Sequence, residues 1–294
     1  MDKLDGFKKF VRRDVPLAMH SWFQLGGPAE YFAEPRDREE LCALLARCRE
    51  EQISVHILGF GSNLLIADAG IPGVVVRLSS PAFGDIRIQD DQVHAGGGAK
   101  LGRVITASVH EGLAGLEGLI GIPGTVGGAI RGNTSTNSTG IGEHVKRLTV
   151  ARFDGHIDEL SPDEITFGHR TSSLEDVVIL EATFQLTPDD QPELSRRMQK
   201  MWIVRKTVQP IAPHCAGRLF MNPRGQVAGE LIEQAGLKGT RIGGAVISER
   251  DANFVIIEPE CTANDVQRLI ELVQEQVSER TNTDLELQLE TWGR

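Results

Sequence analysis

Three glycine-rich segments are the part of this chain whose residue types and spacing could do chemistry. The longest covers residues 115–133, where glycine is interleaved with leucine, isoleucine and valine. The other two, residues 58–65 and 95–98, each follow or end a strand-like apolar run. Glycine lets the main chain approach a ligand closely, and successive main-chain N–H groups in such turns form concave anion sites. Together the segments indicate the wall of a site for a phosphate-bearing cofactor.

A structural explanation competes with this interpretation. Each segment could be a tight connection between a strand and a helix in an α/β protein. A solvated linker is a poorer explanation, because it would carry Ser, Lys or Glu among its glycines. The occurrence of three such segments in one chain favours the cofactor site.

The elements that must position these segments follow from hydrophobic periodicity. Helices are expected over residues 37–52, 101–112, 193–207, 228–235 and 262–280, and residues 1–20 are expected to form a helix and its lead-in. Residues 21–29 are expected to form a strand that enters a glycine turn. Further strands are expected over residues 31–35, 55–58, 73–78, 86–88, 93–95, 145–153, 156–160, 177–186, 243–248, 253–258 and 285–290. Asp37 and Thr262 are suited to cap the helices that follow them. The strand–helix–strand order before residue 78 predicts a right-handed crossover and parallel pairing.

Composition and length indicate a soluble globular protein of more than one domain. The chain has 294 residues, and the polar, proline-rich residues 188–192 are the expected linker. A net charge of −10 argues against a nucleic-acid surface. No apolar run reaches the roughly 20 residues that cross a bilayer, so no membrane partner is expected. The cysteines lack metal-ligand spacing, which indicates reduced thiols in the cytoplasm and no metal site.

Motifs along nearly the whole chain resemble the UDP-N-acetylenolpyruvoylglucosamine reductase (MurB) family. Each motif is weak alone, whereas their combination in the same order is very specific. The matching segments are residues 20–29, 58–65, 115–118, 121–129, 209–210, 216–223, 228–232 and 243–245.

The resemblance implies a mixed α+β flavoprotein. Its FAD-binding domain would be of the vanillyl-alcohol-oxidase/PCMH type and would cover residues 1–190, as two α+β subdomains of about 1–80 and 81–190. A C-terminal α+β substrate-binding domain would cover residues 191–294. In that family NADPH reduces FAD, and UDP-N-acetylglucosamine enolpyruvate becomes UDP-N-acetylmuramate for peptidoglycan synthesis. The small-molecule UDP-sugar is then the expected partner of a cytoplasmic monomer.

The resemblance also assigns residues to sites. The FAD would be non-covalent, because Asn63 and its neighbours offer no histidine for a covalent link. The expected FAD-binding residues are Gly59, Gly61, Ser62, Asn63, Gly121, Ile122, Gly124, Thr125, Gly127 and Gly128. The expected catalytic residues are Arg170, Arg218 and Gln288, and the expected substrate-binding residues are His169, Asn222 and Lys206.

Two of the three catalytic positions depart from the family pattern. Arg218 stands where the family has a serine or cysteine proton donor, and Gln288 stands where it has a glutamate. Arginine is a poor proton donor but a good partner for an anion, and glutamine can hydrogen-bond but cannot supply a proton. Cys215, or a water held by Arg218, is then the candidate donor. His169 replaces the tyrosine of the family motif around Arg170.

Three functions follow from these residues. The first is the reductase with an altered proton path, which substrate-dependent NADPH oxidation would support. The second is a paralogue that binds FAD and a UDP-sugar without reducing it, which a large gain on Arg218→Ser with Gln288→Glu would support. The third is a flavin oxidase of the same fold, which rapid reoxidation in air would support.

Overall fold

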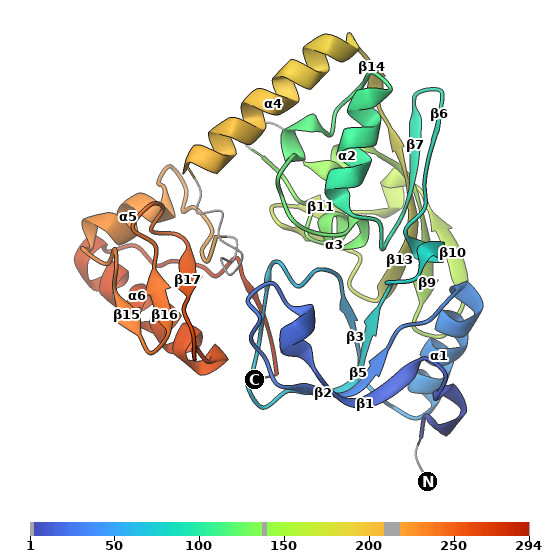
Figure 1. Ribbon diagram of the computed structural model, residues 1–294, viewed down its shortest axis with the longest axis horizontal. Coiled ribbons are helices and arrows are strands. Elements are labelled where there is room, and N and C mark those ends of the chain that lie inside the picture. Colours follow the sequence, from blue (N-terminus) through green and yellow to red (C-terminus); the bar gives the residue numbers. More distant parts are fainter. Residues whose placement is uncertain (1–2, 137–139, 209–217, 294) are drawn as a thin grey trace. The chain divides into compact units, whose positions relative to one another are not determined.

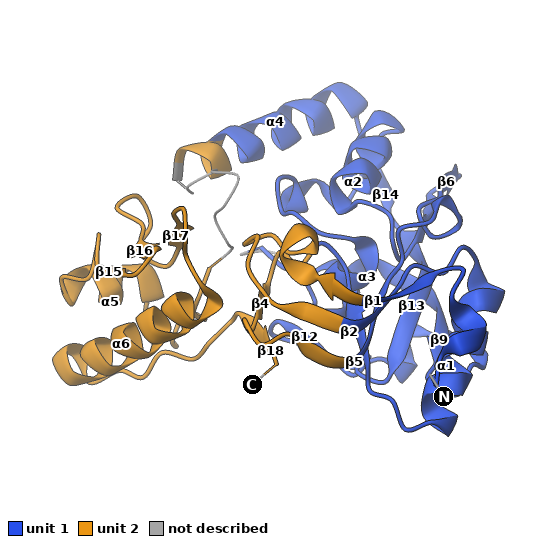
Figure 2. Ribbon diagram, turned by 60° about the horizontal axis from the view of Figure 1, so that its bottom comes forward, with its two compact units in different colours: residues 1–13, 30–60, 73–203 blue, residues 14–29, 61–72, 204–294 orange. Residues whose placement is uncertain are grey.

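The computed structural model describes residues 3–136, 140–208 and 218–293, which form two compact units. Unit 1 comprises residues 1–13, 30–60 and 73–203, and unit 2 comprises residues 14–29, 61–72 and 204–294. Figure 2 shows unit 1 in blue and unit 2 in orange. The last change from unit 1 to unit 2 falls between residues 203 and 204. These units are built from separate segments of the chain and are not the continuous domains expected from the sequence. The expected domain boundary between residues 190 and 191 therefore stays a prediction.

A five-stranded antiparallel sheet with the order β10-β9-β13-β7-β6 forms the centre of unit 1 (Figure 1). Its strands are β6 (Ile86–Gln89), β7 (Gln92–Gly96), β9 (Val145–Arg152), β10 (Ile157–Leu160) and β13 (Val177–Gln185). The strands expected over residues 86–88, 93–95, 145–153 and 156–160 are confirmed, and they pair as two antiparallel hairpins, β6–β7 and β9–β10. Helices α2 (Leu101–His110) and α3 (Val126–Arg131) share one hydrophobic core with the sheet, because their apolar sides are buried against it.

A four-stranded sheet with the order β1-β2-β5-β3 contributes most of its residues to unit 1. Its strands are β1 (Val11–Pro16), β2 (Pro28–Ala33), β3 (Val55–Leu58) and β5 (Ile71–Arg77). The predicted parallel pairing of β3 with β5 is confirmed. Helix α1 (Arg38–Glu50) begins as predicted after Asp37, whose carboxylate accepts a hydrogen bond from the Glu40 N–H at 2.9 Å.

Two predictions for the N-terminal region are wrong. The helix expected over residues 1–20 is replaced by short 3-10 turns and by β1, in which Val11 and Val15 are buried and the residues between them are exposed. Phe7 and Phe10 still pack on the core of unit 1, which explains their helix-like spacing. The strand expected over residues 21–29 is mostly turns, and β2 begins only at Pro28.

Smaller elements complete unit 1. A hairpin joins β11 (Phe167–Gly168) to β12 (Thr171–Ser172), and β8 (Leu113–Ala114) pairs with β14 (Thr187–Pro188). Among the described residues, unit 1 has 3-10 helices at Asp5–Phe7, Pro81–Phe83, Glu117–Leu119, Ile141–His144 and Pro162–Glu164, and unit 2 has one at Leu17–His20.

Helix α4 (Gln191–Val208) differs in two respects from its prediction. Residues 188–192 form the end of β14 and the start of α4, so they are not a loose linker. The apolar side of α4, formed by Leu194, Met198, Met201 and Trp202, was expected to pack in the core. Leu194 is buried and Met198 packs on the core of unit 1, whereas Met201 and Trp202 are exposed, so the expectation holds only for the first half of the helix. Within the described part of the chain, no helix combines the length and hydrophobicity that a bilayer crossing requires.

Unit 2 packs two helices with a three-stranded antiparallel sheet around one core. The elements are α5 (Ala228–Gln234), α6 (Ala263–Thr281), β15 (Arg241–Ile242), β16 (Ala245–Ile247) and β17 (Val255–Ile257). Helix α6 starts at a capping box, in which the Thr262 hydroxyl accepts from the Asp265 N–H and the Asp265 carboxylate accepts from the Thr262 N–H. The apolar stripe predicted for α6 is fully buried.

The last strand of unit 2 lies beyond its predicted position. Strand β18 (Glu290–Trp292) pairs in parallel with β4 (Leu64–Ile66), which was not predicted. In the expected strand over residues 285–290, Leu285 and Leu289 are buried and Leu287 forms a single bridge to Phe220. The alternation of apolar and polar residues over 285–290 therefore arises from leucines of an irregular segment that contact the core, and not from a strand at that position.

Candidate flavin and substrate sites

Unit 1 contains a cavity of about 190 Å³ where the glycine segments meet. The ends of β3 and β5, the loop after β7, helix α3 and the start of β13 contribute to its wall. Its glycines are Gly59, Gly97, Gly98, Gly127 and Gly128, and its cations are Arg77, Lys100 and Arg131. Its other lining residues are Ile57, Leu58, Phe60, Leu78, Ser79, Thr125, Leu174, Val177 and Ile179.

Two glycines of this wall are required by main-chain packing. A Cβ on Gly97 would lie 1.9 Å from the Ile179 carbonyl oxygen, and a Cβ on Gly98 would lie 2.1 Å from the Leu78 carbonyl oxygen. No side chain fits at such distances, because the neighbouring atoms belong to the backbone. These glycines therefore let separate strands come together at the cavity.

The amides of these glycines are already used inside the protein, contrary to the simple anion-site interpretation. The Gly97 N–H donates to the Leu180 carbonyl at 2.8 Å, and the Gly127 N–H donates to the Gly97 carbonyl at 2.8 Å. The Gly128 N–H donates to the Thr125 hydroxyl at 3.3 Å. Charge for an anion must therefore come from elsewhere in the wall.

Cationic side chains meet this need. Lys100 Nζ lies 5.6 Å from the centroid of the Phe60 ring, so the cation is held at the cavity beside an aromatic face. The Arg131 guanidinium donates to the Glu175 carbonyl at 3.2 Å. A cationic and partly apolar wall suits a diphosphate joined to a ring system. The volume is below the roughly 300–1,000 Å³ of whole small-molecule sites, so this cavity suits part of a dinucleotide.

The residues expected to bind FAD fall into three groups. Gly59, Thr125, Gly127 and Gly128 line the cavity of unit 1. Gly121, Ile122 and Gly124 precede α3 and are not among its lining residues, and Ile122 packs on the core of unit 1. Gly61, Ser62 and Asn63 belong to unit 2.

The cations of the cavity were missed from the sequence. A single lysine or arginine near a strand end has the pattern of a solvated charge. The available signal was that Lys100 lies two residues after the third glycine segment, with only Ala99 between them.

Unit 2 brings together three of the expected site residues. The Asn63 side-chain amide donates to the Gln288 carbonyl at 2.9 Å, and the Gln288 N–H donates to the Leu219 carbonyl at 2.8 Å, next to Arg218. The Arg218 guanidinium lies 3.9 Å from the Asp251 carboxylate and is about one third exposed, at 33%. Burial lowers the pKa of the Arg205 guanidinium, and the neighbouring Arg218 cation lowers this pKa further. A cationic region thus lies beside Gln288.

Arg170 lies in unit 1, in the two-residue turn between β11 and β12. Its φ is +60°, a left-handed conformation that is uncommon for a residue with a side chain. The Arg170 guanidinium donates to the Ser135 carbonyl at 3.2 Å. His169 is the exposed neighbour of Arg170 in the same turn. Left-handed non-glycine residues concentrate at functional sites, so this turn is a candidate.

The other two residues expected to bind substrate lie elsewhere. Asn222 Oδ1 accepts from the Ala228 N–H at 3.1 Å, at the start of α5. Lys206 lies in the last turn of α4, and its carbonyl accepts from the Arg250 guanidinium at 3.4 Å. Cys215, the candidate proton donor, lies outside the described residues.

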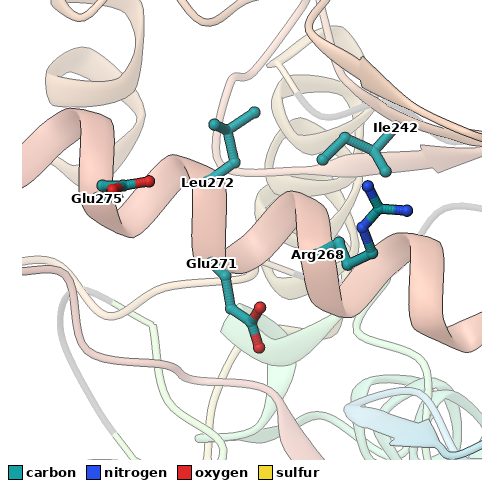
Figure 3. A pocket seen from close by; sticks show the side chains of 5 residues that line it. All are labelled: Ile242, Arg268, Glu271, Leu272 and Glu275. Carbon is teal, nitrogen blue, oxygen red and sulfur yellow. The ribbon is translucent and has the colours of Figure 1, made fainter.

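A second hollow, of about 510 Å³, lies along α6 (Figure 3). Arg268, Glu271, Leu272 and Glu275 of α6 line it, together with Ile242 of β15. None of the expected site residues lines this hollow, and we assign it no role.

Two family models match the chain. A model described as FAD binding domain matches residues 29–161, and one described as UDP-N-acetylenolpyruvoylglucosamine reductase, C-terminal domain, matches residues 209–292. A UDP-N-acetylenolpyruvoylglucosamine reductase of Rhodopirellula baltica is 38% identical over 282 residues, which is 96% of this chain and 92% of the relative. One of Moorella thermoacetica is 40% identical over 289 residues, or 98% of this chain and 95% of the relative. The chain belongs to the UDP-N-acetylenolpyruvoylglucosamine reductase family.

A solved structure of this reductase family shares the fold. The crystal structure of the enzyme (MurB) from Thermus caldophilus matches with a TM-score of 0.84 and 35% identity, over 97% of this chain and 100% of that one. The family resemblance and the α+β FAD-binding fold with a C-terminal domain, both predicted from the motifs, are therefore confirmed. At the two positions where the resemblance implies a proton donor and a glutamate, this chain has Arg218 and Gln288.

Proposed function

We propose that this chain reduces UDP-N-acetylglucosamine enolpyruvate to UDP-N-acetylmuramate, with NADPH as reductant and non-covalent FAD as cofactor, in peptidoglycan precursor synthesis. The net reaction adds one hydride and one proton across the enolpyruvyl double bond and releases NADP⁺. The observation that carries the proposal is the glycine-lined, cationic cavity of unit 1 in a chain that matches the reductase over almost its whole length. FAD, when bound, supplies the hydride transfer from NADPH to the substrate.

The proposed FAD-binding role of unit 1 follows from its side chains. Lys100 and Arg131 offer positive charge to a diphosphate, because ionised donors make the stronger hydrogen bonds to phosphate oxygens. Gly59 and Gly127 line the cavity with main chain, and a Cβ on either would meet neighbouring protein atoms, the Thr125 hydroxyl at 2.8 Å and the Gly97 carbonyl oxygen at 3.1 Å. Apolar residues of β13, Val177 and Ile179, exclude water from the inner wall.

Arg170 is proposed to stabilise the transition state. Hydride addition to the enol ether builds negative charge beside the substrate carboxylate. A fixed cation directed at this charge favours the transition state more than the ground state. His169, in the same turn, is proposed to bind substrate.

Arg218 and Gln288 are proposed to bind the substrate and to hold the proton-donating group. Arg218 pairs with a substrate carboxylate or phosphate, and Gln288 donates or accepts a hydrogen bond. The proton comes from a water held by Arg218 or from the Cys215 thiol. A general acid is typically worth about 10²–10⁴-fold in rate, so its replacement slows the reaction without abolishing it. Asn222 and Lys206 complete the proposed substrate-binding set.

The proposal includes a monomeric state and a cytoplasmic location. Cys42, Cys48 and Cys261 are free thiols, as in proteins of reducing compartments. Burial raises the pKa of Cys48 to about 11, so this thiol stays protonated and unreactive at neutral pH.

The test of this function is steady-state oxidation of NADPH by the FAD-loaded protein. We expect turnover that requires UDP-N-acetylglucosamine enolpyruvate and yields UDP-N-acetylmuramate. UDP-N-acetylglucosamine, which lacks the enolpyruvyl group, is the matched control and should give none. Absence of substrate-dependent turnover by flavin-loaded protein would contradict the proposal.

A further inference from the structure

We infer that Asn133 is a positioning residue for Arg170. The Asn133 side chain fixes the β11–β12 hairpin to the loop that follows α3, and so holds Arg170 in place. This inference rests on the role proposed above for Arg170. No motif assigns Asn133 this role, because its partners are main-chain groups of distant residues.

The Asn133 amide uses both of its ends. Its Nδ2 donates to the Gly168 carbonyl at 2.8 Å, and its Oδ1 accepts from the Gly142 N–H at 3.2 Å. These partners lie in the hairpin and in the 3-10 helix Ile141–His144. One donor and one acceptor, each satisfied on a different segment, define the orientation of the amide.

The backbone at Asn133 is suited to this task. Its φ is +36°, in the left-handed region where asparagine is several-fold enriched. The site is also closely packed, because a Cβ on Gly140 would lie 2.8 Å from Asn133 Oδ1. Neighbouring segments therefore restrict where the amide can point.

The contact is made where it affects Arg170 most. Gly168 is the last residue before the two-residue turn, so Asn133 holds the carbonyl that opens the turn. Two further bonds hold the hairpin: the Ser172 hydroxyl donates to the carbonyl of Arg131, the last residue of α3, at 2.7 Å, and the Arg170 guanidinium donates to the carbonyl of Ser135 in the loop that follows α3. Arg131, whose carbonyl accepts the bond from Ser172, also lines the cavity of unit 1 that is proposed to bind FAD. The hairpin is therefore fixed to the wall of that cavity.

Loss of the Asn133 amide should release the turn without dismantling the cavity. The Arg170 conformation is sparsely populated for a residue with a side chain, so it persists only when its surroundings hold it. A misplacement of about 1 Å can cost about a hundredfold in rate. We expect this cost in the step where charge develops on the substrate, with FAD content unchanged.

Asn133→Gly is the primary variant, because glycine keeps the left-handed φ and removes both side-chain bonds. Asn282→Gly is the matched control: Asn282 has a φ of +53° at the end of α6 in unit 2. Asn133→Asp is a second variant that keeps the acceptor for Gly142 and replaces the donor to Gly168, so it covers the case in which glycine unfolds the loop.

Two measurements separate positioning from mere stability. Hydrogen–deuterium exchange of residues 167–172 should accelerate in Asn133→Gly and Asn133→Asp but not in Asn282→Gly. The kcat for substrate-dependent NADPH oxidation should fall about tenfold to a hundredfold. In an Arg170→Ala background the same Asn133 substitutions should change kcat less than about twofold, because the two residues act as one unit.

The outcomes discriminate clearly. Unchanged exchange at the hairpin, or an equal loss of kcat with and without Arg170, overturns the inference. Accelerated exchange together with a loss that depends on Arg170 supports it. If wild-type protein oxidises no NADPH with the substrate, the proposed function fails, and with it the catalytic part of this inference. The exchange data then still decide whether Asn133 fixes the hairpin.

Discussion

Arg218 and Gln288 lie on neighbouring main-chain segments of unit 2, joined by the hydrogen bond from the Gln288 N–H to the Leu219 carbonyl. The pair places a permanent cation and a neutral amide where the resemblance implies a proton donor and a carboxylate. Such a pair can bind an anion but cannot itself supply a proton at neutral pH. The proposed chemistry at this point of the chain is therefore binding, with the proton delivered by another group.

Restoration of the family residues tests this view. We predict that Arg218→Ser with Gln288→Glu raises kcat by about tenfold or more, because a positioned general acid is worth about 10²–10⁴-fold. Arg241→Ser, at an exposed ion pair with Glu258 in the same unit, is the control and should leave kcat unchanged. Unchanged kcat in the double variant would show that neither position takes part in proton transfer. A large gain from an inactive wild type would favour a paralogue that binds without reducing.

The elements around the FAD cavity depend on contacts between backbones. Strands β7 and β13 approach so closely at Gly97 that its amide donates to Leu180 and its Cα faces the Ile179 carbonyl. The cavity wall is thus continuous with the central sheet. The shape of the cavity should therefore change when a single methyl group is added at Gly97. It should not change when a methyl group is added at Gly102 in α2.

A pair of glycine substitutions tests this difference. Gly97→Ala should lower the free energy of unfolding by about 1–3 kcal/mol and reduce FAD content, because the added Cβ meets backbone that cannot give way. Gly102 lies in α2 with open space where a Cβ would be. Gly102→Ala should therefore raise the free energy of unfolding by about 0.4–1 kcal/mol and leave the FAD content unchanged. Urea unfolding and the flavin-to-protein absorbance ratio measure both effects. Equal behaviour of the two variants would contradict the packing argument.

Elements defined by local signals could be predicted from the sequence, and those defined by distant partners could not. Helices α1 and α6 combine an apolar stripe with a capping side chain, and both signals lie within the helix itself. Strands β4 and β18 are short and pair across most of the chain length, so no local pattern marks them. Strand β1 was taken for helix because Phe7 and Phe10 reach the core from turns.

The same distinction holds for the site. The glycine segments of the sequence predicted Gly59, Thr125 and Gly127 as cofactor-binding residues, and the fold brings these three residues to one cavity. Lys100 could not be identified as a cavity residue, because its significance depends on the strands that the fold places beside it. Asn133 ends the longest glycine segment, but its positioning role was not predicted, because its partners are main-chain groups that carry no sequence signal.

At the scale of the whole molecule, the proposed activity is distributed over two units. Unit 1 holds the cavity proposed for FAD and the turn with Arg170, and unit 2 holds Arg218, Gln288 and Asn63. The chain enters unit 2 with residues 14–29 and 61–72 before its long C-terminal part, so the second glycine segment contributes to both units. Because the residues proposed for catalysis fall in both units, we expect neither unit alone to reduce the substrate.

The most direct measurement is the visible spectrum of the intact protein without oxygen. The account predicts flavin absorbance that NADPH bleaches and that UDP-N-acetylglucosamine enolpyruvate then restores. A colourless protein that takes up no added FAD would contradict the account. So would a bleached flavin that the substrate leaves unchanged while air restores it rapidly, as a flavin oxidase would behave.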